Sequence, residues 1–216
     1  MTGKRYYLAG ILLTAAALIA TSAAYPHLPA SVPRHWDLNG QANGYSPKWA
    51  LFLIGPGLMC ATMLVTWRLP WLSPKRFEVE SFQATYTEVM LITVCLLAYM
   101  DALILWSGLG HGVNAGRAGL FGACLCLAFL GNITGKIRRN FYIGVRTPWA
   151  LASERVWNAT HRLAAKTFVA GGVAGMVLLG IGLNGWPPFT ALMLGALIPA
   201  PYSLYFYKQL ERRGEL

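Results

Sequence analysis

Charge is scarce in this sequence, and acidic residues are the scarcest. Charged residues make up 12% of the chain, against about 25% in a typical soluble domain, and hydrophobic residues make up 56%. Eight residues are acidic, whereas eighteen are Lys or Arg. This composition excludes an ordinary soluble domain and predicts an integral membrane protein.

Cysteine is also sparse, and its spacing argues against a metal centre. The sequence has no Cys-x-x-Cys pair, and its four cysteines all fall inside apolar stretches: Cys60, Cys95, Cys124 and Cys126. Cys124 and Cys126 would point to different faces of a helix because they are two residues apart. We therefore expect no metal and no cofactor, and we interpret the cysteines as small side chains within a helix bundle.

Long apolar runs dominate the remainder of the chain. Each is close to the roughly 20 residues that a helix needs to cross the hydrocarbon core. The pattern predicts an all-α integral membrane protein, a six-transmembrane helix bundle in two parts. We expect a two-span hairpin over residues 1–68 with an outer cap loop at 25–48, and a four-span region over 85–210 with short amphipathic helices in an inner connector at 134–162. The predicted spans are about 6–24, 49–67, 85–107, 118–135, 163–183 and 187–207.

The basic residues predict the orientation of these spans. Fifteen of the eighteen Lys and Arg residues, including Lys75 and Arg76, fall on one side of the predicted spans, which the positive-inside rule assigns to the cytoplasm. Six spans then place both termini in the cytoplasm. The positive charges are dispersed over several loops, which argues against direct nucleic-acid binding. The opposite side holds Arg34, Lys48 and Arg117.

The first apolar run has two interpretations. Lys4 and Arg5, the run itself and the small residues at 20–24 fit a cleavable signal peptide. The run is also long enough to span the membrane, so we favour a retained first helix.

The outer connector from Tyr25 to Lys48 is rich in turn-forming residues. Its prolines oppose a regular helix, and Asn39-Gly40 and Asn43-Gly44 are dipeptides that accept tight turns. We expect an ordered cap in which His35 and Asp37 could pair if the segment is extended. Alternating oxygen ligands resemble a calcium loop, but Lys48 stands where a bidentate Glu is required, so we favour turn formation over metal binding.

The inner connector contains two predicted helix starts. Thr147 followed by Pro148 is typical of a capped helix N-terminus, and Ser153 predicts a second cap for a helix that continues into the fifth span. On that helix Glu154, Trp157 and His161 share one face. One interpretation is an interfacial helix with Trp149 and Trp157 at headgroup level and arginines on lipid phosphates. The alternatives are a docking surface for a cytoplasmic partner and a pocket that uses His161.

Two acids fall inside the predicted third span. Glu88 lies near its cytoplasmic end, whereas Asp101 lies deeper, where an unpaired charge costs at least ~2–3 kcal/mol. We therefore expect Asp101 to have a polar partner. The candidates are Arg117, His111, Arg34 and His35, and we favour Arg117 or a group of the outer cap.

Small residues and prolines predict how the helices pack. Gly171 and Gly175 form a small-xxx-small pair that lets another helix approach closely. Gly55-Pro56-Gly57 in the second span, and Pro199 with Pro201 in the sixth, predict local breaks.

Two strings resemble the signature of the bacterial SdpI family. They are Ile143 to Leu151, IGVRTPWAL, and Val156 to Arg162, VWNATHR. The run Pro33 to Gln41, with Gly44, Tyr45 and Lys48, resembles the extracytoplasmic domain of unknown function that often precedes this family's region. Together the two resemblances cover about residues 10–60 and 85–210.

The resemblance implies a multi-pass protein of the bacterial inner membrane that gives immunity to a secreted membrane-active toxin. It also implies the possible capture of a cytoplasmic repressor, with membrane lipids as the surroundings. Signature and partner-binding roles then fall on Arg146, Thr147, Pro148, Trp149, Trp157, Thr160, His161 and Arg162. Toxin contact falls on His35, Trp36, Asp37, Asn39 and Gly40.

Two other function classes stay open. A small transporter or channel could use Asp101 and the broken spans, although the sequence shows no internal repeat. An intramembrane enzyme could use His161, Glu154 or His35, but the sequence has no His-Glu-x-x-His motif and no nucleophile-base pairing.

Overall fold

The six predicted spans are six long apolar helices. A computed structural model describes residues 2–72 and 79–216, and six of its helices are long and apolar enough to cross a membrane. Lys75, Arg76 and Glu78 lie outside the described residues. The helical elements are α1 (Thr2–Ala24), a π-helix (Leu53–Gly57) continued by α2 (Leu58–Arg68), α3 (Gln83–Gly108), α4 (Ala115–Thr134), α5 (Pro148–Ala152), α6 (Glu154–Gly180), α7 (Trp186–Leu197) and α8 (Pro199–Arg212).

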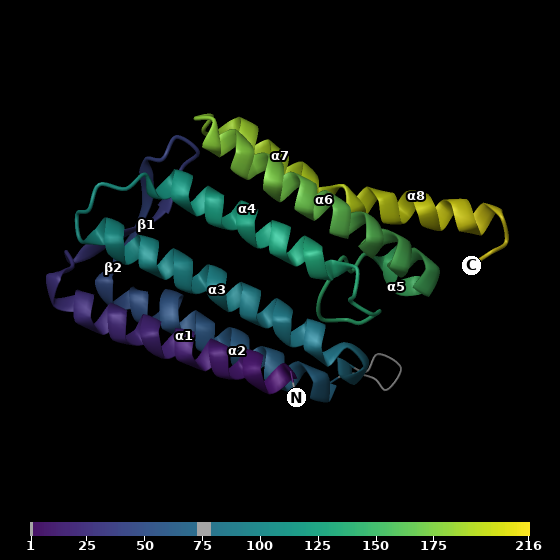
Figure 1. The fold of residues 1–216 in the computed structure, drawn as a ribbon, viewed down its shortest axis with the longest axis horizontal. Helices are drawn as coiled ribbons and strands as arrows, with labels where there is room; N and C mark the ends of the chain where they lie inside the picture. The colour runs from purple at the N-terminus through teal and green to yellow at the C-terminus, as the bar shows by residue number, and fades with distance from the viewer. Residues whose placement is uncertain (1, 73–78) are drawn as a thin grey trace.

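The long helices run side by side, so that the connectors gather at two ends (Figure 1). One end, here the hairpin end, carries a small β-sheet. The other, the termini end, carries α5, the start of α6 and both chain ends. Lateral surfaces of the bundle expose large apolar side chains, including Leu12, Ile19 and Leu197, as expected of helices that face lipid.

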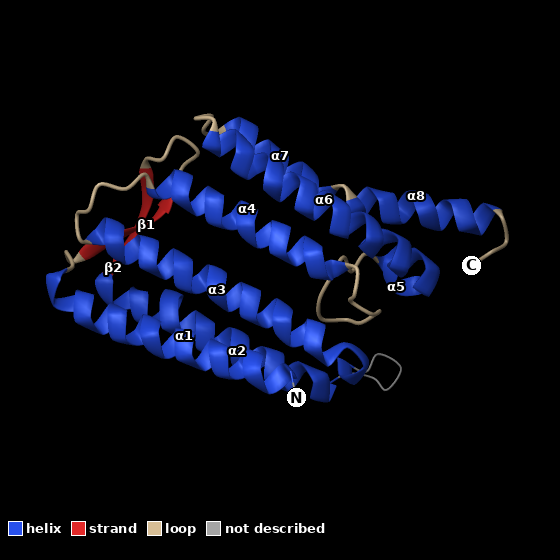
Figure 2. Ribbon diagram, in the orientation of Figure 1, coloured by secondary structure: helices blue, strands red, loops and turns tan. Residues whose placement is uncertain are grey.

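The outer cap is a β-hairpin, so the all-α prediction is wrong in this segment. Strands β1 (Ser31–Trp36) and β2 (Ala42–Pro47) pair antiparallel, with Val32 opposite Ser46 and Trp36 opposite Ala42 (Figure 2). The turn predicted at Asn39-Gly40 is present, and Gly40 has a φ of 83°. Strands form because Val32 and Trp36 pack on α3 and the second span, which no short-range pattern of the cap reveals.

Glycines of α6 let its neighbours approach closely, as predicted from the pair Gly171 and Gly175. A Cβ on Gly171 would lie 2.7 Å from the Cα of Gly195 in α7. On the adjacent face, a Cβ on Gly172 would overlap the backbone of Cys124 in α4. Helices without these side chains pack backbone to backbone, which is the main attraction available between helices in lipid.

The proline-rich positions break two spans, as predicted. Pro56 lies inside the π-helix at the start of the second span, and the sixth span divides into α7 and α8 at Ile198, directly before Pro199. Proline cannot donate the main-chain hydrogen bond of a regular helix, so the chain bends or widens at these points.

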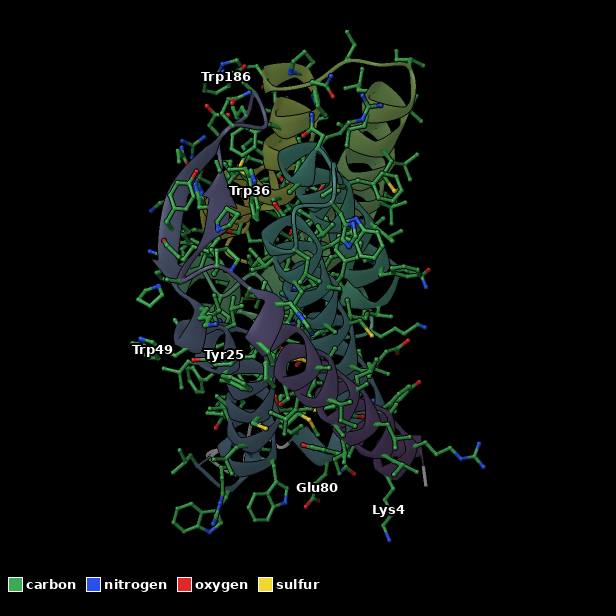
Figure 3. All side chains as sticks on the ribbon, turned by 90° about the vertical axis from the view of Figure 1, so that its left-hand side faces the viewer. Lys4, Tyr25, Trp36, Trp49, Glu80 and Trp186 are labelled. Carbon is green, nitrogen blue, oxygen red and sulfur yellow. The ribbon has the colours of Figure 1, made fainter. Side chains whose placement is uncertain are left out.

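Exposed tryptophans mark both ends of the bundle. Trp49 and Trp186 extend from the periphery of the hairpin end, whereas Trp36 lies among the side chains between the hairpin and the helix ends (Figure 3). Trp67 and Trp71 are exposed near the end of the second span. Two belts of tryptophan are typical of a protein whose ends lie at the two membrane interfaces.

Candidate functional site

A cleft opens between the β-hairpin and the bundle. Its volume is about 710 Å³, and its floor is formed by apolar side chains of α3, α4 and α7, such as Ile104, Leu120 and Phe189. The cap residues singled out from the sequence all line it: His35, Trp36, Asp37, Asn39 and Gly40. The structure therefore gathers these five residues around one cavity.

The hairpin turn packs closely against the start of α4. A Cβ on Gly116 would lie 2.8 Å from the Cα of Gly40 and 3.1 Å from the Asp37 carbonyl oxygen. Asn114 caps α4 by accepting the Arg117 backbone N–H at 2.9 Å, and its side chain also faces Gly40. The turn that roofs the cleft is thus held by close backbone contact with the second half of the chain.

Polar groups line the rim of the cleft. Arg117 donates to the Asn184 side chain at 3.1 Å and to the Leu179 carbonyl. Arg34 donates through Nε to the Tyr45 carbonyl at 3.3 Å. The cleft has an apolar floor, and two arginines and one aspartate among its lining residues.

His35 and Asp37 do not pair with each other, contrary to the expectation for an extended segment. His35 Nδ1 lies 2.5 Å from the Asn43 side-chain oxygen across the hairpin. Asp37 Oδ1 accepts the backbone N–H groups of Asn39 and Gln41, each at 2.9 Å. The Asp37 carboxylate therefore stabilises the hairpin turn that covers the cleft.

Asp101 has a polar partner, but the predicted partners were wrong. Its Oδ2 accepts the Thr21 hydroxyl at 3.2 Å, while Arg117 is bound elsewhere and His111 packs against Trp106 in a tilted ring contact. Asp101 is buried, and Oδ1, which has no hydrogen-bond partner, lies against Gly55 of the π-helix. The carboxyl therefore joins α1, α3 and the broken second span, away from the cleft.

Glu88 occupies a different environment from Asp101. It lies half-buried at one end of an apolar groove of about 380 Å³ between α3 and α4, together with Asn132. The two acids are on separate surfaces of α3 and form no carboxylate pair.

At the termini end, Trp157 and His161 form a buried stacked pair. Trp157 is 0% exposed and His161 is 1% exposed. Trp157 Nε1 donates to the Ile137 carbonyl at 2.8 Å, and His161 Nδ1 lies 2.9 Å from the Trp157 carbonyl. His161 Nε2 accepts the Val145 backbone N–H at 3.1 Å, which fixes the proton on Nδ1. Trp157 therefore cannot anchor at headgroup level, and the interfacial interpretation is wrong for this residue.

Two residues missed in the sequence shape the connector. Asn140 is fully buried; its side chain accepts the N–H groups of Tyr142 and Ile143 and donates to the carbonyls of Arg138 and Ile143. Gly144 has a φ of 100°, and a Cβ there would overlap His161 Nε2. The turn preference of Asn and the glycine two residues before Arg146 were the available signals.

The first predicted helix start is confirmed, and the second is confirmed only in position. Thr147 accepts the Ala150 N–H at 3.2 Å at the start of α5, and its hydroxyl lies 2.7 Å from that of Ser203 in α8. Ser153 precedes α6, but its side chain makes no capping bond. Pro148 is the first residue of α5, and Trp149 is half-buried against the apolar cluster around Trp157.

The remaining signature residues divide between the interior and the surface. Thr160 is 0% exposed, whereas Arg146 and Arg162 are exposed, as is Glu154. Arg146 donates to the Phe141 carbonyl at 2.6 Å. The two arginines thus lie at the surface, while the side chains of Trp157, Thr160 and His161 lie in the interior.

Helix α3 connects the two ends. Near the hairpin end, Ile104 and Leu105 pack with Leu28, Val32 and Leu51. Near the termini end, Tyr86 packs with Trp157, Ile137 and Val156. The same helix therefore contributes side chains to the apolar clusters at both ends.

Two known families match separate parts of the chain. Residues 136–203 match the SdpI/YfhL protein family, and residues 12–60 match a domain of unknown function, DUF1648. The chain thus contains an SdpI/YfhL family region preceded by a DUF1648 region. The SdpI/YfhL match contains the stacked pair, and the DUF1648 match contains the hairpin.

One relative extends the match over nearly the whole chain. The Immunity protein SdpI of Bacillus subtilis (strain 168) is 29% identical over 205 residues, which cover 93% of this chain and 95% of the relative. No solved structure matches the chain. In the described part of the chain, no group of three or more His, Cys, Asp or Glu side chains is placed to hold a metal ion.

Proposed function

We propose that this protein is a multi-pass immunity protein of the bacterial inner membrane that protects its cell against a secreted membrane-active toxin. The observation that carries the proposal is the similarity to the Immunity protein SdpI along 93% of the chain, combined with six candidate spans. The similarity is to an immunity protein and to no enzyme family, which disfavours an intramembrane enzyme.

In this proposal the hairpin end faces outward and both termini lie in the cytoplasm. The asymmetry of Lys and Arg supports this orientation. Reporter fusions after residue 40 and after residue 216 test it, because they should give extracytoplasmic and cytoplasmic signals, respectively. A cytoplasmic signal at position 40 would reverse the orientation.

The cleft beneath the hairpin is the surface proposed to meet the toxin. It combines an apolar floor with polar groups at its rim, which suits an amphipathic segment of a membrane-active molecule. Both family regions line it, since Gly40 lies in the DUF1648 match and Leu179 and Phe189 lie in the SdpI/YfhL match. Contact by the toxin would thus act on the joint between the two regions.

The connector at the termini end is proposed to carry the signal. Burial of Trp157 and His161 assigns them to holding the connector on α6, whereas the exposed arginines Arg146, Arg155 and Arg162 could contact an acidic face of a cytoplasmic repressor. Arg155 pairs with Glu215 at 2.9 Å in the free protein, so this arginine would exchange partners on binding.

A transporter or channel built on Asp101 has less support. The Asp101 carboxyl is bonded to Thr21 and lies against Gly55, and it lines neither the cleft beneath the hairpin nor the two grooves beside α4.

The test is survival of a deletion strain exposed to culture supernatants of neighbouring bacteria. The strain should be more sensitive than its parent to at least one supernatant, and plasmid-borne protein should restore resistance. Equal survival of deletion and parent strains across toxin-producing neighbours, with the protein expressed in the parent, would contradict an immunity function.

A further inference from the structure

A second groove, unrelated to the cleft, runs along the lateral surface between α4 and α6. Its volume is about 760 Å³, and it is open to the lateral surface, with small residues along its floor. Gly131, Ala165, Ala170 and Ala174 supply the floor, and Val169, Val173 and Val177 supply one wall. Small side chains on both helices leave room for a slender apolar chain.

Basic residues stand at one end of this groove on the same face of α6. Arg162, Lys166, Val169, Val173 and Val177 follow one another at spacings of four, three, four and four residues, which places them in a single stripe. Arg162 and Lys166 are exposed, and neither forms an ion pair with a described residue. The stripe is thus cationic at its start and apolar over the rest of its length.

The dimensions of the stripe match one leaflet of a bilayer. A Cβ on Gly135, at the end of α4, would lie 3.7 Å from the Ala165 Cβ, so Lys166 is level with the end of a 20-residue span. From Lys166 to Val177 the helix rises about 16 Å, and half of the hydrocarbon core is about 15 Å thick. The cations therefore lie at headgroup depth and the groove at acyl-chain depth.

We propose that this groove binds an anionic phospholipid of the leaflet at the termini end. Arg162 and Lys166 hold the phosphate and the net negative headgroup, and one acyl chain lies along Val169, Val173 and Val177. Lys and Arg extend their aliphatic stems along apolar surface with the charged group at the interface, which suits this role. The inference does not depend on the toxin-immunity proposal.

A second copy of the chain is a less suitable occupant. Two copies related by a two-fold axis along the membrane normal would bring Arg162 and Lys166 of each close to the same residues of the other. The described residues that line the groove include no acid, so this contact would carry uncompensated like charges.

Native mass spectrometry of the full-length protein in a neutral detergent tests the proposal. The protein is titrated with dioleoylphosphatidylglycerol or with zwitterionic dioleoylphosphatidylcholine. The native chain should prefer the anionic lipid by about tenfold or more, and R162Q/K166Q should reduce the preference to within about twofold. R212Q/R213Q, which changes two exposed cations outside the groove, should keep the full preference.

A third variant tests the groove without changing charge. Ala170→Leu fills the floor at an exposed position, so it should fold normally and weaken binding of both lipids. Undiminished preference in R162Q/K166Q, an equal loss in R212Q/R213Q, or undiminished lipid binding by Ala170→Leu would each overturn the proposal. A dimer that Ala170→Leu dissociates would assign the groove to a second copy instead.

Discussion

The rings of Trp157 and His161 stack with their centroids 3.9 Å apart, and every ring nitrogen of the pair is used inside the protein. The pair holds Ile137 and Val145, which lie in the inner connector, against the first turns of α6. The family signature at the termini end therefore encodes a rigid support for exposed arginines.

His161→Ala should lower stability and protection together. It removes the acceptor of the Val145 N–H, and a buried donor left without a partner costs about 1–3 kcal/mol. Thermal unfolding in detergent and toxin survival should both decline, whereas Asn158→Ala, an exposed change on the same helix, should affect neither. Normal stability with complete loss of protection would instead give His161 a direct functional contact.

Gly144→Ala should be far more damaging than Gly182→Ala. Both glycines have positive φ, 100° and 93°, so alanine should cost about 1–2 kcal/mol at each site from backbone strain alone. At Gly144 the new Cβ would also overlap His161 Nε2, while Gly182 has no atom within 4 Å of that position. The difference in melting temperature between Gly144→Ala and Gly182→Ala measures the effect of the contact with His161. An equal decrease in both variants would show that this contact does not contribute to stability.

Gly116→Ala should loosen the hairpin from the bundle. The added methyl meets backbone atoms of the turn, which cannot rotate away, whereas Gly112→Ala places its methyl in open space. Limited proteolysis of spheroplasts should cut Gly116→Ala faster within residues 31–47 than either Gly112→Ala or the native protein. Identical cleavage rates for the three proteins would mean that the hairpin does not depend on this fit.

Asp101→Asn should be tolerated better than Asp101→Leu. Asparagine can still accept the Thr21 hydroxyl, whereas leucine removes the bond and places a bulkier group against Gly55. Membrane-fraction blotting should show near-native Asp101→Asn and reduced Asp101→Leu, with Glu80→Ala as the exposed control. If Asp101→Asn abolished protection at normal abundance, the ionisable group itself would have a function.

The sequence predicts the spans and their breaks well because each depends on local properties. The length of an apolar run predicts a span, a proline predicts a break in a helix, and the Thr147-Pro148 pair predicts a helix N-terminus. The partner of Asp101 could not be predicted in this way, because Thr21 is 80 residues away and the choice depends on which helix faces α3. The strands of the cap likewise depend on packing of Val32 and Trp36 against distant helices.

The main error at the candidate site was the prediction that Trp157 lies at the membrane interface, because this residue is buried. Tryptophan and arginine next to a membrane helix favour an interfacial interpretation, and Arg162 fits that pattern. Trp157 does not, because residues from α3, α8 and the connector surround it. A helical face alone does not show whether a neighbouring segment covers it.

If the cleft beneath the hairpin is the surface that meets the toxin, filling it should abolish protection. Leu120→Trp should occupy the floor of the cleft, while Leu125→Trp adds the same bulk on another face of α4, in the groove that contains Glu88. The measurement is survival of the deletion strain carrying each variant at equal membrane abundance, challenged with a supernatant that kills the deletion strain. Leu120→Trp should protect at least tenfold less than Leu125→Trp, which should remain near native. Full protection by Leu120→Trp would show that the cleft does not meet the toxin.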